Sequence, residues 1–145
     1  MSSNIKLHNV DCLPFMRECA DKQFDLAIVD PPYGIDVAND NRFGEKASKK
    51  AATHTKDYTK KDWDLGVPTK EYWDELFRIS KNQIVWGGNH FELPQSRGWI
   101  FWDKKMDKGF CLADGELAWT SFDKPARIFE YARGNESGFA PKSVM

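Results

Sequence analysis

Four consecutive residues of this chain, Asp30-Pro31-Pro32-Tyr33, are of types that can hold a planar, amino-bearing ligand. The Asp30 carboxylate and the Pro31 carbonyl accept hydrogen bonds, and the prolines have no N–H that would compete as a donor. An exocyclic amine offers two donors to such acceptors. The Tyr33 ring is a flat surface on which a base can stack, at about 1–3 kcal/mol per base. These residues predict a pocket for the amino edge of a nucleobase; the alternative is a proline-rich connection with a packed tyrosine.

The segment before these residues predicts how they are positioned. Residues 24–29 are apolar except for Asp25, which is typical of a central parallel strand with both faces covered. The two prolines end such a strand, and the residue before each proline is driven toward extended geometry. We therefore expect a stiff loop at the carboxyl end of a central strand over residues 24–30. Open α/β sheets bind their ligands at that end of a strand.

The rest of the chain alternates between helix-like and strand-like patterns. Apolar residues at helical spacing predict helices over residues 11–20 and 69–80, the second with Thr69 as its N-cap. Further strands are predicted at residues 4–8, 83–86, 98–103, 117–122 and 127–131, the last two as a hairpin. The pattern predicts one α/β domain with a mostly parallel sheet and an antiparallel edge hairpin.

The Asp-Pro-Pro-Tyr stretch resembles the catalytic motif of the DNA amino-methyltransferases. These enzymes move a methyl group from S-adenosylmethionine to an exocyclic nitrogen of adenine or cytosine. Residues 10–13, 84–89, 99–104 and 116–122 are similar to further parts of the family, so the likeness spans nearly the whole chain. The resemblance implies a Rossmann-like methyltransferase fold, in the subgroup whose catalytic motif precedes its cofactor motif.

The resemblance also implies roles for individual residues. Those implied as catalytic are Asp30, Pro31, Pro32 and Tyr33. Those implied to lie near the cofactor are Asp11, Cys12 and Asp30. Tyr33 would stack on one face of a flipped base, and Trp119 or Phe122 would meet the other face. Asp30 and the Pro31 carbonyl would accept hydrogen bonds from the amine, and Asp in the first motif position favours adenine N6.

One part of the family pattern is missing from this chain. Members carry a glycine-rich cofactor loop, whereas the ten glycines here include no Gly-x-Gly. Close approach of a backbone to a cofactor needs glycine, followed by the N-terminus of a helix. Residues 1–145 are therefore expected to form a single, partial methyltransferase domain that binds S-adenosylmethionine weakly by itself. An uncovered sheet edge would then favour a homodimer or a missing C-terminal partner segment.

Although the net charge of the whole chain is only −1, one segment is strongly basic. Residues 42–61 contain seven basic and two acidic side chains, a balance of +5, which leaves −6 for the rest of the chain. We expect this segment to be a mobile surface loop beside the Asp-Pro-Pro-Tyr motif, contacting the phosphates of double-stranded DNA. The side chains predicted to make these contacts are Arg42, Lys46, Lys49, Lys50, Lys60 and Lys61. The alternative is an ordinary solvated loop.

The cysteine content and the hydropathy of the chain limit the classes of protein to which it can belong. The three cysteines form no Cys-x-x-Cys pattern, so we expect buried thiols, a cytoplasmic location and no metal site. No apolar stretch reaches the roughly 18 residues that a membrane span needs, so no membrane partner is expected. Two other functions stay open. One is an inactive remnant that binds DNA or protein. The other is a methyltransferase acting on RNA or protein amides, where Asn before the prolines is more usual.

Overall fold

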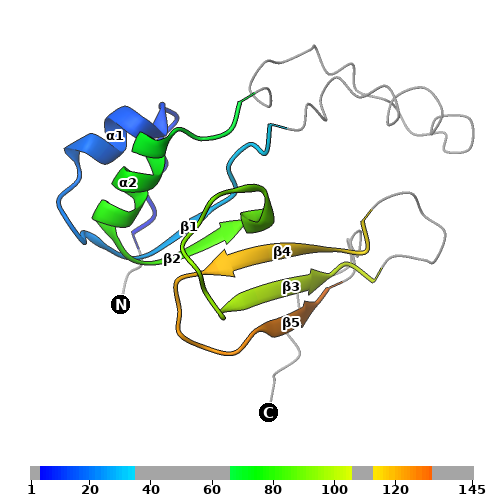
Figure 1. Cartoon of the computed structure of the whole chain (residues 1–145). Helices are drawn as coiled ribbons and strands as arrows, with labels where there is room; N and C mark the ends of the chain where they lie inside the picture. Colours follow the sequence, from blue (N-terminus) through cyan, green and yellow to red (C-terminus); the bar gives the residue numbers. More distant parts are fainter. Residues whose placement is uncertain (1–3, 35–65, 106–112, 132–145) are drawn as a thin grey trace, which may run out of the picture.

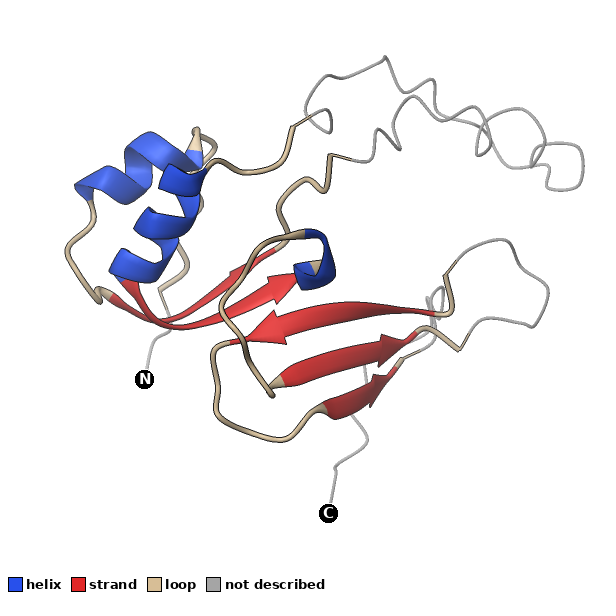
Figure 2. Cartoon of the chain, in the orientation of Figure 1, coloured by secondary structure: helices blue, strands red, loops and turns tan. Residues whose placement is uncertain are grey.

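The computed structural model describes residues 4–34, 66–105 and 113–131 of the chain. Within these ranges one five-stranded mixed sheet carries two α-helices on one of its faces (Figure 1 and Figure 2). The predicted α/β class is confirmed. The basic segment at residues 42–61 lies outside the described residues.

Both α-helices form where the sequence predicts them, and each begins at a side-chain cap. Helix α1 (Cys12–Glu18) is capped by Asp11, whose Oδ1 accepts a hydrogen bond from the Leu13 N–H at 3.0 Å. Helix α2 (Lys70–Ile79) is capped by the Thr69 hydroxyl, which accepts from the Tyr72 N–H at 3.3 Å. A cap satisfies one of the backbone N–H groups that a helix leaves unpaired at its start.

The five strands are ordered β1-β2-β4-β3-β5 across the sheet. Their bounds are β1 Phe24–Val29, β2 Ser80–Trp86, β3 Trp99–Asp103, β4 Gly115–Thr120 and β5 Arg127–Glu130. Strand β1 is parallel to β2 and β3 is parallel to β5, whereas β4 is antiparallel to both of its neighbours. Four strands therefore run in one direction and the interior strand β4 runs against them.

Three details of the sequence prediction are wrong. Strands β4 and β5 do not form a hairpin, because β3 lies between them and β5 pairs with β3. Among the described residues β1 is an edge strand, not a central one. Residues 4–8 belong to no strand. Each error concerns which segments lie next to each other, which alternation along one segment does not specify.

The core lies between the helices and the sheet. It contains Met16 and Cys19 from the α1 region, Leu76 and Ile79 from α2, and Val85 and Trp119 from the sheet. Arg78 joins the two helices, since its Nη1 and Nη2 donate to the carbonyls of Cys19 and Met16, both at 2.8 Å. Cys19 is buried as expected, but Cys12 is exposed, because it lies at the solvent-facing start of α1.

Only one face of β1 is covered by these helices. Ala27 and Val29 pack against the core, whereas Leu26 and Ile28 project to the opposite side and are 42% and 61% exposed. Alternation along a strand places these two pairs on opposite faces of the sheet. Among the described residues no helix covers the second face (Figure 2).

Candidate functional site

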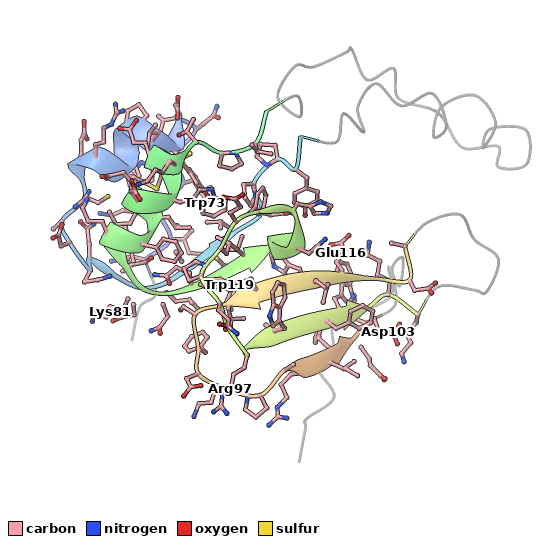
Figure 3. The ribbon with its side chains drawn as sticks, viewed as in Figure 1. Trp73, Lys81, Arg97, Asp103, Glu116 and Trp119 are labelled. Atoms are coloured by element: carbon pink, nitrogen blue, oxygen red, sulfur yellow. The ribbon has the colours of Figure 1, made fainter. Side chains whose placement is uncertain are left out.

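The carboxyl ends of β1 and β2 form the candidate site. Because these strands are parallel and adjacent, the segments that follow them lie at the same end of the sheet. Strand β1 leads into Asp30–Tyr33, and β2 leads into a turn at Gly87 and a 3-10 helix, η3 (Gly88–His90). In Figure 3 the labelled residues Asp103 and Glu116 mark this end of the sheet, and Arg97 marks the other end.

Asp30 and Tyr33 are hydrogen-bonded to each other. The Tyr33 hydroxyl donates to Asp30 Oδ1 at 2.6 Å. Asp30 is exposed, Pro31 is buried, and Pro32 and Tyr33 are half-buried. Since the backbone between them is fixed at two prolines, the carboxylate and the phenol ring are held in one relative position. No other hydrogen bond to the Asp30 carboxylate is present within the described residues.

The Tyr33 ring packs against the segment after β2. It stacks on the His90 imidazole, with ring centroids 4.8 Å apart and planes 10° apart, and it meets the edge of Phe91 at 6.0 Å. His90 is exposed, so this stack lies at the surface. The arrangement shows that a planar ring is accommodated against Tyr33 at this end of the sheet.

Gly87 is the residue that allows this packing. Its φ is 62°, in the left-handed region that favours glycine, and a Cβ there would lie 2.5 Å from Tyr33 Cζ. A Cβ on Gly88 would in turn overlap Trp119. The glycine pair therefore serves internal packing against two aromatic side chains, which excludes it as a loop open to a cofactor.

The two residues predicted for the second face of a base are not beside Tyr33. Trp119 is 3% exposed, its indole N–H donates to the Pro94 carbonyl at 2.8 Å, and it belongs to the core (Figure 3). Phe122 follows the carboxyl end of β4, and because β4 is antiparallel to β2 this is the opposite end of the sheet. Phe122 there lines a cavity with Phe77 and Gln83. Neither residue is placed to stack on a base held at Tyr33.

Asp11 and Cys12, implied by the resemblance as cofactor neighbours, lie at the start of α1. The Asp11 carboxylate already accepts the hydrogen bond that caps the helix. Cys12 lies within electrostatic range of Tyr72. Burial, with a smaller contribution from a Cys12 charge, raises the pKa of the Tyr72 hydroxyl to about 12. Asp11 therefore caps α1, and Cys12 lies near Tyr72 of α2.

A third strand, β3, ends in a cluster of charges at the same end of the sheet as the candidate site. Lys104 is buried, forms an ion pair with Glu116, and its Nζ lies 5.3 Å from the centre of the Trp102 ring. Lys105 pairs with Asp103 at 2.9 Å and with Glu130 at 2.8 Å. Hydrogen bonds from the backbone and side chain of Lys105 lower the pKa of Asp103. These pairs neutralise each other and fix the ends of β3, β4 and β5.

Other predictions fall partly outside the described residues. The six basic residues predicted to contact DNA, Arg42, Lys46, Lys49, Lys50, Lys60 and Lys61, are all outside them. Within the described ranges no three His, Cys, Asp or Glu side chains are grouped to hold a metal ion. No helix in the same ranges has the length and apolar character needed to cross a membrane.

His90, Phe91 and Gly87 are the site residues that sequence reasoning missed. They come from a segment more than fifty residues after Tyr33, so no local pattern links them to the motif. The one available signal was the Gly87-Gly88 pair directly after a strand, which indicates a tight turn or a close contact. No family model, curated protein or solved structure matches the chain.

The described residues fit a site that accepts hydrogen bonds from an amine better than they fit a cofactor cradle. Asp30 is an exposed carboxylate at the end of a strand, as an amine ligand requires. A cradle for S-adenosylmethionine, however, needs a glycine-rich turn open to a ligand and leading into a helix. The Gly87-Gly88 turn is filled by aromatic rings and leads into three residues of 3-10 helix. No such cradle is present within the described residues.

Proposed function

We propose that this chain is the target-base-binding part of an S-adenosylmethionine-dependent DNA methyltransferase that modifies adenine at N6. The observation that carries the proposal is the Asp30–Tyr33 pair, with the carboxylate and the ring held together at the end of β1. The proposal assigns the methyl group to S-adenosylmethionine, whose cradle must come from polypeptide other than the described residues. A Rossmann-like methyltransferase fold is part of the proposal.

Asp30 and Pro31 would orient the amine of the target base. Two acceptors, the Asp30 carboxylate and the Pro31 carbonyl, match the two N–H donors of an exocyclic amine. Hydrogen bonds to these acceptors increase electron density on the nitrogen, whose lone pair is otherwise delocalised into the ring. Catalysis by such a site comes from positioning and electrostatics, so no covalent intermediate on the protein is required.

Tyr33 would stack on the flipped base, and the position of His90 indicates which face of the Tyr33 ring the base would contact. The imidazole lies 4.8 Å from the Tyr33 ring, at a separation and tilt suited to aromatic stacking. We propose that a base entering from this side displaces the exposed His90 side chain and stacks in its place. Flipping a base out of a duplex costs a few kcal/mol, which stacking partly offsets.

Double-stranded DNA is the proposed substrate. The basic residues within 42–61 would contact phosphates, which contributes affinity but no sequence information. Binding should therefore weaken as salt rises, with a logarithmic slope of about −0.9 per phosphate neutralised. A salt-independent affinity would contradict this assignment.

The test is methylation of unmethylated genomic DNA, which contains every candidate site. The chain is incubated with this DNA and saturating S-adenosylmethionine, and methylated bases are quantified by mass spectrometry. We expect N6-methyladenine, reduced on the order of 100-fold by Asp30→Ala because one oriented acceptor is lost. Asp123→Ala is the matched control, since Asp123 is an exposed carboxylate at the opposite end of the sheet.

A second candidate function is a DNA-binding module without catalytic activity. The observation that favours it is that the described residues include no cofactor cradle. Salt-dependent DNA binding with no methylated base at saturating cofactor would support this candidate and contradict the first. Calorimetric titration with S-adenosylmethionine gives an independent measurement: the first candidate predicts weak binding to the chain, and this candidate predicts no detectable heat.

A further inference from the structure

One side of β1 has no partner within the described residues. On its other side β1 pairs with β2 over the register Phe24–Ser80 to Val29–Val85. An edge strand presents a row of backbone N–H and C=O groups that can pair with another strand. The open side of β1 is therefore a surface whose natural ligand is an extended segment.

The side chains of this edge specify the kind of segment. Leu26 and Ile28 are 42% and 61% exposed, and both project from the face that the helices leave uncovered. Asp25 lies on the opposite face, with its side chain 89% exposed and paired with Lys81 at 2.7 Å. A matching strand needs two apolar residues two positions apart on one face, and between them a residue that is compatible with the Asp25 carboxylate on the other face.

Residues 4–8 of the same chain have this pattern. They read Asn-Ile-Lys-Leu-His, with apolar residues in alternate positions and a lysine between them. Ile5 is 82% exposed and Leu7 is 93% exposed, and no described residue pairs with this segment through its backbone. A five-residue strand extends about 17 Å at 3.3 Å per residue, which is close to the length of β1.

We propose that two copies of this chain associate by exchange, with residues 4–8 of each copy pairing with β1 of the other. With Ile5 and Leu7 opposite Leu26 and Ile28, in either strand direction, the four apolar side chains share one face. Lys6 then lies opposite Ala27, one diagonal step from the Asp25 carboxylate. The exchange is reciprocal, so it closes as a two-fold dimer and extends the sheet on both copies.

This proposal does not depend on the proposed enzymatic function. It rests on a strand edge that is open among the described residues, on a strand-like segment whose backbone pairs with none of them, and on the complementarity of the two. Two other partners could occupy the open side of β1: the β1 strand of a second copy, or a strand of a different polypeptide. The experiment separates them, because only exchange requires both β1 and residues 4–8.

The experiment measures oligomeric state by light scattering and sedimentation over a range of concentrations. We expect the wild-type chain to reach twice its 16.7 kDa mass. The variant Ile28→Lys changes the edge, and the variant Ile5→Lys/Leu7→Lys changes the segment. Each should weaken dimerisation about tenfold or more, because the first loses two cross-strand apolar pairs per dimer and the second loses four. The matched control is Ile128→Lys, at a similarly exposed position (70%, against 61% for Ile28) on the strand at the far edge, which should dimerise like wild type.

Mixing the two variants gives the decisive measurement. A mixed dimer contains one interface with both changes and one interface of wild-type residues, so exchange predicts that mixing partly restores dimer. Circular dichroism of each variant establishes that it is folded. A wild-type chain that stays monomeric at all concentrations overturns the proposal. A segment variant that dimerises normally also overturns it and would indicate pairing of β1 with β1. A mixture of the two variants that forms no more dimer than either variant alone overturns it as well.

Discussion

At the scale of single residues, the candidate site depends on Gly87 as much as on the motif. Gly87 has a φ of 62° and lies under the Tyr33 ring. We expect Gly87→Ala to lower the free energy of unfolding by about 2–4 kcal/mol, from the left-handed backbone and from overpacking. Urea denaturation followed by tryptophan fluorescence measures the change.

Gly66→Ala is the matched control for this prediction. Among the described residues, a Cβ on Gly66 would contact nothing within 4 Å, and the φ of Gly66 is not in the left-handed region. We expect this variant to be neutral or to stabilise the protein by up to about 1 kcal/mol, through the unfolded chain. Equal effects of the two variants would contradict the packing role assigned to Gly87.

The residues of the site differ in how well sequence predicts them. Asp30 and Tyr33 are three positions apart and joined by prolines, so their proximity follows from local geometry. His90 reaches Tyr33 only because β1 and β2 are neighbours, which is a property of the sheet. Trp119 faces the core, which its type could not predict, because an aromatic residue in a strand can face either the core or a ligand.

At the scale of elements, α1 is a seven-residue helix that depends on its cap. We expect Asp11→Ala to destabilise the protein by about 0.5–2 kcal/mol, because the Leu13 N–H loses its acceptor. Asp11→Asn keeps an acceptor oxygen and should have a much smaller effect. Chemical denaturation of the two variants checks this. An equal loss in both would mean that the carboxylate charge, not capping, is what the fold requires.

The contact between Arg78 and Glu75 on α2 predicts a dependence of stability on pH. Hydrogen bonds from the Arg78 guanidinium lower the pKa of the Glu75 carboxyl below its usual 4.5. The unfolded chain therefore binds this proton more readily than the folded protein, and stability rises with pH across that range. The contribution is complete above pH 4.5 and is lost as the pH falls through the lowered value.

Urea midpoints of wild type and Glu75→Gln between pH 7 and pH 3 test this dependence. We expect the variant to be less stable at pH 7 and the difference to shrink as the pH falls. Glu92→Gln is the control, since Glu92 is exposed and has no ion pair within the described residues. A difference that stays constant down to pH 3 would contradict the assignment.

The elements also show where sequence reasoning succeeds. Helices α1 and α2 were predicted from caps and apolar spacing, which are local signals. All five strands lie within or close to predicted segments. The order of the strands in the sheet could not be predicted from local signals. Strand β4 lies between β2 and β3 because it pairs with both, and these pairings join segments that are distant in the sequence. Pairing of this kind depends on the whole sheet.

At the scale of the whole molecule, the interior strands of the sheet are better buried than its edge strand β5. Strands β2 and β4 are paired on both sides and include Val85, Ala118 and Trp119, all nearly inaccessible to solvent. Strand β5 is exposed along its length. We expect native-state hydrogen exchange to be slowest in β2 and β4 and fastest in β5, since exchange reports local opening. Equal protection of β5 and β2 would indicate that a further surface covers β5.

The proximity of Gly34 to Val67 has a consequence for engineering this chain. A Cβ on Gly34 would lie 3.0 Å from Val67 Cγ1 and 3.8 Å from the carbonyl carbon of Gly66, so the points where the chain leaves and re-enters the described fold adjoin. Each doubling of a connecting loop changes its closure free energy by only about 0.6 kcal/mol. A linker of different length between Gly34 and Gly66 should therefore cost little closure free energy. A chain with such a linker would test the DNA contacts that we propose for residues 42–61.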